Sequence, residues 1–143
     1  MYNIEEAAEE LHEVTAWQTT PYPVYDDDYV KIVVRAIKKL FVDTNHPEEF
    51  NRDLYITSET GVFVYDYSFD ILQEEYIFII SQMNFYTKIY DDTAGDGAVS
   101  YTTDALSVTG AKEGYKSIQQ RLDILEQERI RVFHKIMSRE QGD

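Results

Sequence analysis

One stretch near the end of the chain decides the fold: YKSIQQRLDILEQERIRVFHKIM, residues 115–137. Its apolar residues recur every three or four positions, like the seam of packed helices, and they are Tyr115, Ile118, Leu122, Leu125, Val132 and Ile136. Arg129 interrupts this seam. A second apolar face follows on the later turns, with Ile130, Phe133 and Met137. The pattern predicts a C-terminal helix of more than roughly 25 residues, longer than a small domain can cover, so that part of it packs on another chain.

Upstream of this stretch, a broad apolar stripe predicts another long helix, which begins near Ser68 or Asp70 and ends at about Tyr90. The composition of residues 91–97 predicts an acidic loop, and Thr and Ser residues favour an extended segment from Val99 to Val108. Helix is expected to return after Gly110.

The first half of the chain contains two more helical patterns and one change of period. An amphipathic helix is expected from Ile4 to Val14, with Asn3 and Glu6 in capping-box spacing. Further elements are a helix from Asp26 to Phe41, a single turn at 45–50 and a β-hairpin at 54–67. The expected fold class is therefore mainly α: a small bundle of about four helices with an inserted β-hairpin and a long C-terminal helix.

The length and charge of the chain limit the number of domains and the kinds of partner that can be expected. Its 143 residues predict a single domain over 1–143, and its net charge is -14. Residues 1–111, the acidic helical body, contain six cationic side chains against twenty-one acidic ones, whereas residues 112–143, the long C-terminal helix, contain seven against six. Such an acidic surface disfavours binding to nucleic-acid phosphates. The uneven charge favours a distinct partner surface or self-assembly, and the alternative is that acidity only keeps the chain soluble.

No pattern in the sequence points to a reaction. Cysteine is absent, and His12, His46 and His134 lie far apart without metal-ligand spacing. The loop at 91–97 matches the calcium loop of an EF-hand only in part, because Ala94 and Thr103 stand where oxygen ligands are required. We expect no catalytic, cofactor-binding or metal-ligating residues, no enzyme activity, no membrane span and no secretory signal.

The expected functional surface is therefore a protein interface. Its candidate residues lie on the C-terminal helix and are Tyr115, Ile118, Leu122, Arg129, Ile130, Arg131, Phe133, Ile136 and Met137. Arg129 and Arg131 either pair with neighbouring glutamates of the same helix or bridge subunits. The twelve tyrosines of the chain fit an interface or a core lined with phenols.

The end of the chain also resembles a known family. The segment YTTDALSVTGA at residues 101–111, together with Tyr115 and the helix LDILEQERIR at 122–131, resembles head-tail connector (adaptor) proteins from tailed bacteriophages of Gram-positive hosts. The resemblance extends from Leu72 to Met137 and contains no catalytic signature.

This resemblance implies a non-enzymatic virion protein of the neck, assembled in the host cytoplasm. Such adaptors form a ring, commonly of twelve copies, beneath the portal protein; the ring extends the DNA channel, without specific DNA binding, and offers a docking surface to the next neck or tail protein. Other virion roles stay open: a neck stopper, a tail terminator or a head-decoration protein. A different class also stays open, an acidic inhibitor that imitates DNA and occupies a host protein.

Overall fold

The computed structural model describes residues 2–15, 26–50, 55–57, 63–100 and 105–142, and side chains at 2–15, 28–50, 64–88 and 118–139. Within these ranges the elements are β1 (Tyr2–Asn3), α1 (Ile4–Thr15), α2 (Asp26–Asp43), the 3-10 helix η2 (Pro47–Glu49), β2 (Tyr55–Thr57), β3 (Phe63–Tyr65), α3 (Ile71–Ser100) and α4 (Ala105–Gly142). The expected fold class is confirmed: the chain is mainly helical, with a small antiparallel sheet and a long C-terminal helix.

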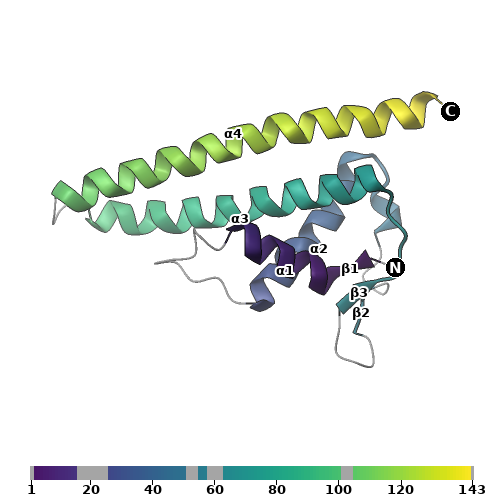
Figure 1. Ribbon diagram of the computed structural model, residues 1–143, viewed down its shortest axis with the longest axis horizontal. Coiled ribbons are helices and arrows are strands. Elements are labelled where there is room, and N and C mark those ends of the chain that lie inside the picture. Colours follow the sequence, from purple (N-terminus) through teal and green to yellow (C-terminus); the bar gives the residue numbers. More distant parts are fainter. Residues whose placement is uncertain (1, 16–25, 51–54, 58–62, 101–104, 143) are drawn as a thin grey trace.

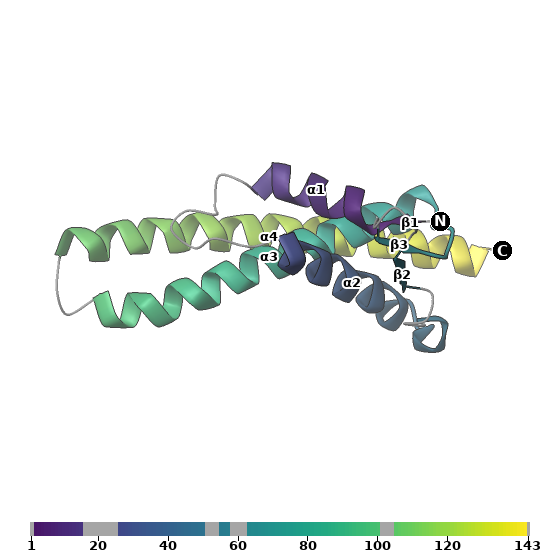
Figure 2. The same cartoon turned by 90° about the horizontal axis from the view of Figure 1, so that it is seen from below.

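Helices α3 and α4 lie side by side and antiparallel, and α1 and α2 pack against the side of α3 that faces away from α4 (Figure 1). Seen from below, α1 and α2 flank α3 on opposite sides (Figure 2). The end of α3 that leads to Ser100 and the start of α4 at Ala105 extend beyond α1, α2 and the sheet, and we call this projecting part the helical arm.

Local signals place the starts of α1 and α3. The Asn3 side chain accepts a hydrogen bond from the Glu6 backbone N–H at 3.0 Å, as the capping-box spacing predicts. At α3, the Gln73 N–H donates to Asp70 Oδ1 at 2.9 Å, and the Asp70 N–H donates to Gln73 Oε1 at 3.1 Å. This is a complete capping box, so α3 begins at its expected position.

The end of α2 is also set locally. Asn45 adopts a left-handed backbone conformation with φ of 65°. The His46 N–H donates to the Phe41 carbonyl at 2.8 Å, and the Asn45 N–H donates to the Val42 carbonyl at 3.1 Å. These two bonds form a Schellman cap, in which Asn takes the position that glycine usually occupies. The single turn expected after it is η2.

The expected hairpin is present, and it has a third strand. Strands β2 and β3 pair antiparallel with Ile56 opposite Val64, and β1 pairs with the other edge of β3, with Tyr2 opposite Tyr65. The sheet order is therefore β1-β3-β2. A strand of two residues is too short to show alternation, which is why the sequence did not predict β1.

The long helices differ most from expectation. Helix α3 does not end at Tyr90 but continues to Ser100, and α4 begins at Ala105 rather than after Gly110. The prediction of a loop at 91–97 was therefore wrong. The predicted extended segment is helical at 99–100 and 105–108, and its residues 101–104 lie outside the described residues. Glycine costs about 1 kcal/mol in a helix interior, and the neighbouring helix of an antiparallel pair outweighs so small a local preference.

The core lies where α1, α2 and α4 meet α3. Its largest fully buried side chains include four phenols and two phenylalanines: Tyr29, Tyr65, Tyr76, Tyr86, Phe41 and Phe85. Of the two interpretations of the tyrosines, the core explains these four. Val14, expected on the buried stripe of α1, is instead exposed because it lies to one side of the line through Ile4 and Leu11.

Candidate functional site: the outer flank of helix α4

The apolar seam of α4 is covered within the chain. Ile118 is 3% exposed and Ile136 is 0% exposed, and Leu125 and Val132 between them are equally buried. Both Ile118 and Ile136 were expected at a protein interface, and this expectation was wrong. Because α3 runs alongside α4, the seam packs against α3 instead of a second molecule.

The other residues expected at the interface differ in how far they are buried. Leu122 and Phe133 are partly buried against the core, and the ring of Phe133 lies 6.5 Å from that of Tyr76, centroid to centroid. Arg131 is exposed. The Tyr115 backbone belongs to α4, but its side chain lies outside the described residues.

One apolar face of α4 remains accessible beside the seam. Ile130, Phe133 and Met137 are three and four residues apart, so they share one side of the helix, which we call the α4 flank. Ile130 is 41% exposed, and Phe133 and Met137 are half-buried. Ile124 is exposed as well, on the opposite side of the helix, and the sequence did not single it out. Accessible apolar side chains that share one face of a helix are a candidate surface for contact with another protein.

Arg129 occupies the interrupted position of the seam and makes intramolecular bonds there. Its Nε and Nη2 donate to the two carboxylate oxygens of Glu126 at 2.9 and 2.5 Å, and its Nη1 donates to the Tyr76 hydroxyl at 3.3 Å. The Tyr76 hydroxyl in turn donates to Asp43, at the end of α2, whose carboxylate also pairs with Lys39 at 3.3 Å. These contacts use Arg129 inside the subunit, so it is a positioning residue for α2, α3 and α4 rather than a bridge between subunits.

Arg129, Glu126, Tyr76 and Asp43 form a hydrogen-bonded network, and their contacts shift the pKa values of some of its members. Burial raises the pKa of Tyr76, the hydrogen bond to Asp43 raises it further, and Arg129 opposes both effects. The bond from Arg129 holds the pKa of Glu126 below its usual value, and the same bond raises the pKa of Arg129. Tyr76 therefore remains a neutral phenol at neutral pH.

Further polar contacts hold the helices in register. Arg139, near the end of α4, pairs with Asp70 at the start of α3 at 2.6 Å. Lys88 of α3 pairs with Asp28 of α2 at 3.4 Å. These contacts lie at separate points along α3, so they resist sliding of α2 and α4 along it.

The part of the chain that the structure describes contains no group of three or more histidine, aspartate or glutamate side chains placed to hold a metal ion. The partial match to an EF-hand at 91–97 lies on helical backbone, which does not have the turns of a calcium loop. None of the described helices is both long and apolar enough to cross a membrane.

Comparisons of the chain with protein-family models, with curated proteins and with solved structures find no match.

Proposed function

We propose that this chain is a non-enzymatic structural protein of a tailed bacteriophage, a head-tail connector of the adaptor type. In this role, copies form a ring beneath the portal protein, extend the DNA channel through the neck and offer a surface to the next neck or tail protein. The α4 flank is the part of each copy that contacts the portal protein.

The observation that carries the proposal is the combination of a projecting helical arm with an accessible apolar flank on α4 (Figure 1). The helical arm presents surface to neighbouring molecules. The apolar side chains of the α4 flank lie on the other part of α4, beside the body, where their exposure to water favours association. The resemblance of the segment from Leu72 to Met137 to phage adaptors supports the same role.

The charge of the chain also suits a DNA channel. A net charge of -14 repels the phosphate backbone, so DNA passes a wall built from such subunits without adhesive contacts. The proposal makes DNA a passing cargo and gives it no binding site.

Binding to the portal protein tests the proposal. The purified chain is mixed with the portal protein of the same phage, and binding is followed by co-sedimentation and native mass spectrometry. Ile130→Glu is expected to weaken binding at least about tenfold, because it places a charge in an apolar contact. Ile124→Glu, on the opposite side of α4, is the matched control and should bind like the unchanged chain.

Ile130 is chosen for substitution because its side chain is exposed, so that a charge there does not disturb the core. Charged substitutions at both Phe133 and Met137 would disturb packing against the core, since Phe133 lies beside Tyr76. Circular dichroism of each variant checks whether the fold is retained. The connector role is wrong if the unchanged chain does not bind the portal protein, and the α4 flank is the wrong surface if Ile130→Glu binds normally.

Two other roles predict different results in experiments on purified virions and on host proteins. A head-decoration or tail protein would be found in purified virions, but away from the neck in an image reconstruction with labelled chain. A DNA-imitating inhibitor would be absent from virions and would form a salt-sensitive complex with a basic host protein.

A further inference from the structure

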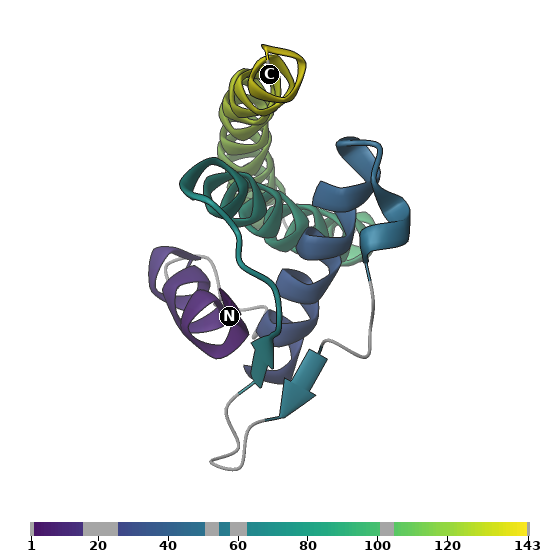
Figure 3. The same cartoon turned by 90° about the vertical axis from the view of Figure 1, so that its right-hand side faces the viewer.

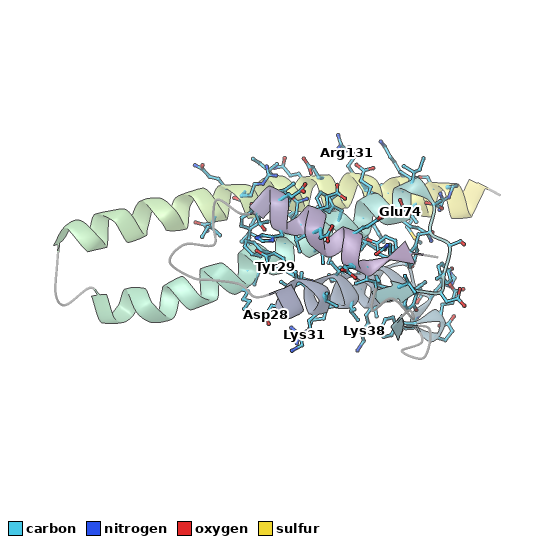
Figure 4. All side chains as sticks on the ribbon, turned by 60° about the horizontal axis from the view of Figure 1, so that its bottom comes forward. Asp28, Tyr29, Lys31, Lys38, Glu74 and Arg131 are labelled. Atoms are coloured by element: carbon cyan, nitrogen blue, oxygen red, sulfur yellow. The ribbon has the colours of Figure 1, made fainter. Side chains whose placement is uncertain are left out.

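The outward face of α2 is a cationic surface on an acidic protein. Lys31, Arg35, Lys38 and Val42 recur at helical spacing and all are exposed, Val42 by 51%. Lys31 and Lys38 point away from the rest of the fold (Figure 4). None of the ion pairs between described side chains involves these three cations. We call this surface the α2 face.

A groove of opposite charge lies between α1 and the first turns of α3. It is a hollow of about 430 Å³ lined by four exposed glutamates, with Tyr2, Phe78 and Ile71 among its apolar lining. The glutamates are Glu6, Glu10, Glu74 and Glu75. No ion pair between described side chains involves any of them. Ile71 at its edge is 82% exposed. We call this surface the acidic groove.

The acidic groove concentrates negative charge. Burial raises the pKa of Tyr2, and the charges of Glu74 and Glu10 raise it further, which reflects the negative potential inside the hollow. Two of the carboxylates come from α1 and two from α3, and none of the four pairs with a cation among the described side chains.

The two surfaces lie on different sides of the subunit. Seen end on, α1 and α2 lie next to each other on the side of α3 that faces away from α4, with α1 to the left and α2 to the right (Figure 3). Glu74 also lies on the side of the fold opposite Lys31 and Lys38 (Figure 4). A single molecule therefore cannot bring its own α2 face into its own acidic groove, whereas two molecules can.

We propose that the α2 face of one copy docks in the acidic groove of a second copy, so that copies join head to tail. Charge complementarity identifies the occupant: three cations meet four carboxylates, all without an ion pair to another described side chain, and Val42 and Ile71 add one exposed apolar side chain to each surface. Because the contacting surfaces differ, the contact is heterologous, and its repetition closes a ring when the rotation between copies allows it. The contact stands by itself; only its closure into a ring rests on the proposed function.

Sedimentation velocity of the full chain tests the contact in low salt at concentrations up to about 0.5 mM, which detects even weak association. The unchanged chain is expected to associate, and raising the salt to about 0.5 M should weaken the association, since screening shortens the reach of the charges. Lys31→Glu with Lys38→Glu, and separately Glu74→Lys with Glu75→Lys, should each weaken it at least about tenfold.

A mixture of the two double variants gives the decisive readout. The normal α2 face of one variant fits the normal groove of the other, and the reversed surfaces again have opposite signs. An equimolar mixture should therefore regain association that neither variant shows alone. Lys135→Glu with Asp123→Lys changes exposed charges of α4 outside both surfaces and is the matched control, which should associate like the unchanged chain.

Several outcomes would overturn the inference. They are an unchanged chain that stays monomeric in low salt, double variants that associate normally, and a mixture that does not regain association. An α2 face that binds a different, acidic protein while the chain alone stays monomeric also counts against it. Failure of the proposed function looks different: association between copies persists, but the portal protein is not bound.

Discussion

Arg129 of α4 donates a hydrogen bond from Nη1 to the hydroxyl oxygen of Tyr76 of α3, 3.3 Å away, and that hydroxyl donates to Asp43 of α2. One phenol thus joins three helices. Arg129 occupies a seam position of α4, and the seam positions one turn before and one turn after it hold apolar residues. A shift of α4 along α3 would therefore bury the guanidinium away from the Tyr76 hydroxyl and leave its charge without this partner. We infer that this contact favours one register of the antiparallel pair.

The Tyr76 hydroxyl is expected to contribute to stability. Tyr76→Phe removes both hydrogen bonds and leaves Asp43 and Arg129 without this partner, which should lower the free energy of unfolding by about 1–3 kcal/mol. Urea denaturation followed by circular dichroism measures this. In a double-mutant cycle with Arg129→Met, the coupling energy should be about 0.5–3 kcal/mol. A coupling energy of zero would show that the two side chains act independently.

Alkaline pH should destabilise the fold through the same phenol. The pKa of Tyr76 is raised in the folded chain above the ordinary value of 10.0, so the unfolded chain loses this proton first. The contribution of Tyr76 is complete below pH 10 and is lost as pH rises toward the folded pKa. The difference in unfolding free energy between the unchanged chain and Tyr76→Phe should therefore shrink above pH 10. A difference independent of pH would contradict the raised pKa.

The seam residues Ile118 and Ile136 should behave as core residues. Each substitution to alanine is expected to cost about 2–4 kcal/mol in the free energy of unfolding of the isolated chain, because it leaves a cavity against α3. Ile130→Ala serves as the control and should cost less than about 1 kcal/mol, since Ile130 is partly in water. Equal costs for the three variants would mean that α4 does not pack on α3 as described.

Asp70 has two roles that two substitutions can separate. Asp70→Ala removes the cap of α3 and the ion pair with Arg139, and it should cost about 1–2 kcal/mol. Asp70→Asn retains an oxygen that accepts the Gln73 N–H but loses the charge, and it should cost less than about 1 kcal/mol. Thermal unfolding of both variants measures the difference; if Asn is as harmful as Ala, the ion pair outweighs the cap.

Much of the fold was predictable because its signals are local. The spacing of apolar residues in α2 and α4, the Asn3 cap and the alternation in the hairpin each involve residues within a turn or two of one another. The start of α3 near Asp70 was predictable for the same reason. The end of α3 was not, because glycines and aspartates at 91–97 suggested a loop, and only the neighbouring α4 accounts for continued helix.

The candidate site was predicted only in part. Periodicity identified the α4 flank, with Ile130 exposed as expected, but it assigned Ile118 and Ile136 to an interface. It did not identify the acidic groove, whose glutamates come from residues 6–10 and 74–75, far apart in the sequence. No spacing rule connects such segments.

The sequence by itself determined that the chain is mainly helical, strongly acidic and equipped with a C-terminal helix whose apolar stripe requires a partner. The tertiary structure decided which partner that stripe has, namely α3 of the same chain, and which surfaces remain for other molecules. The physical reason is that helix formation and capping depend on neighbours along the chain. Burial and the gathering of charge depend on which element lies opposite, and that is set only when the whole chain packs.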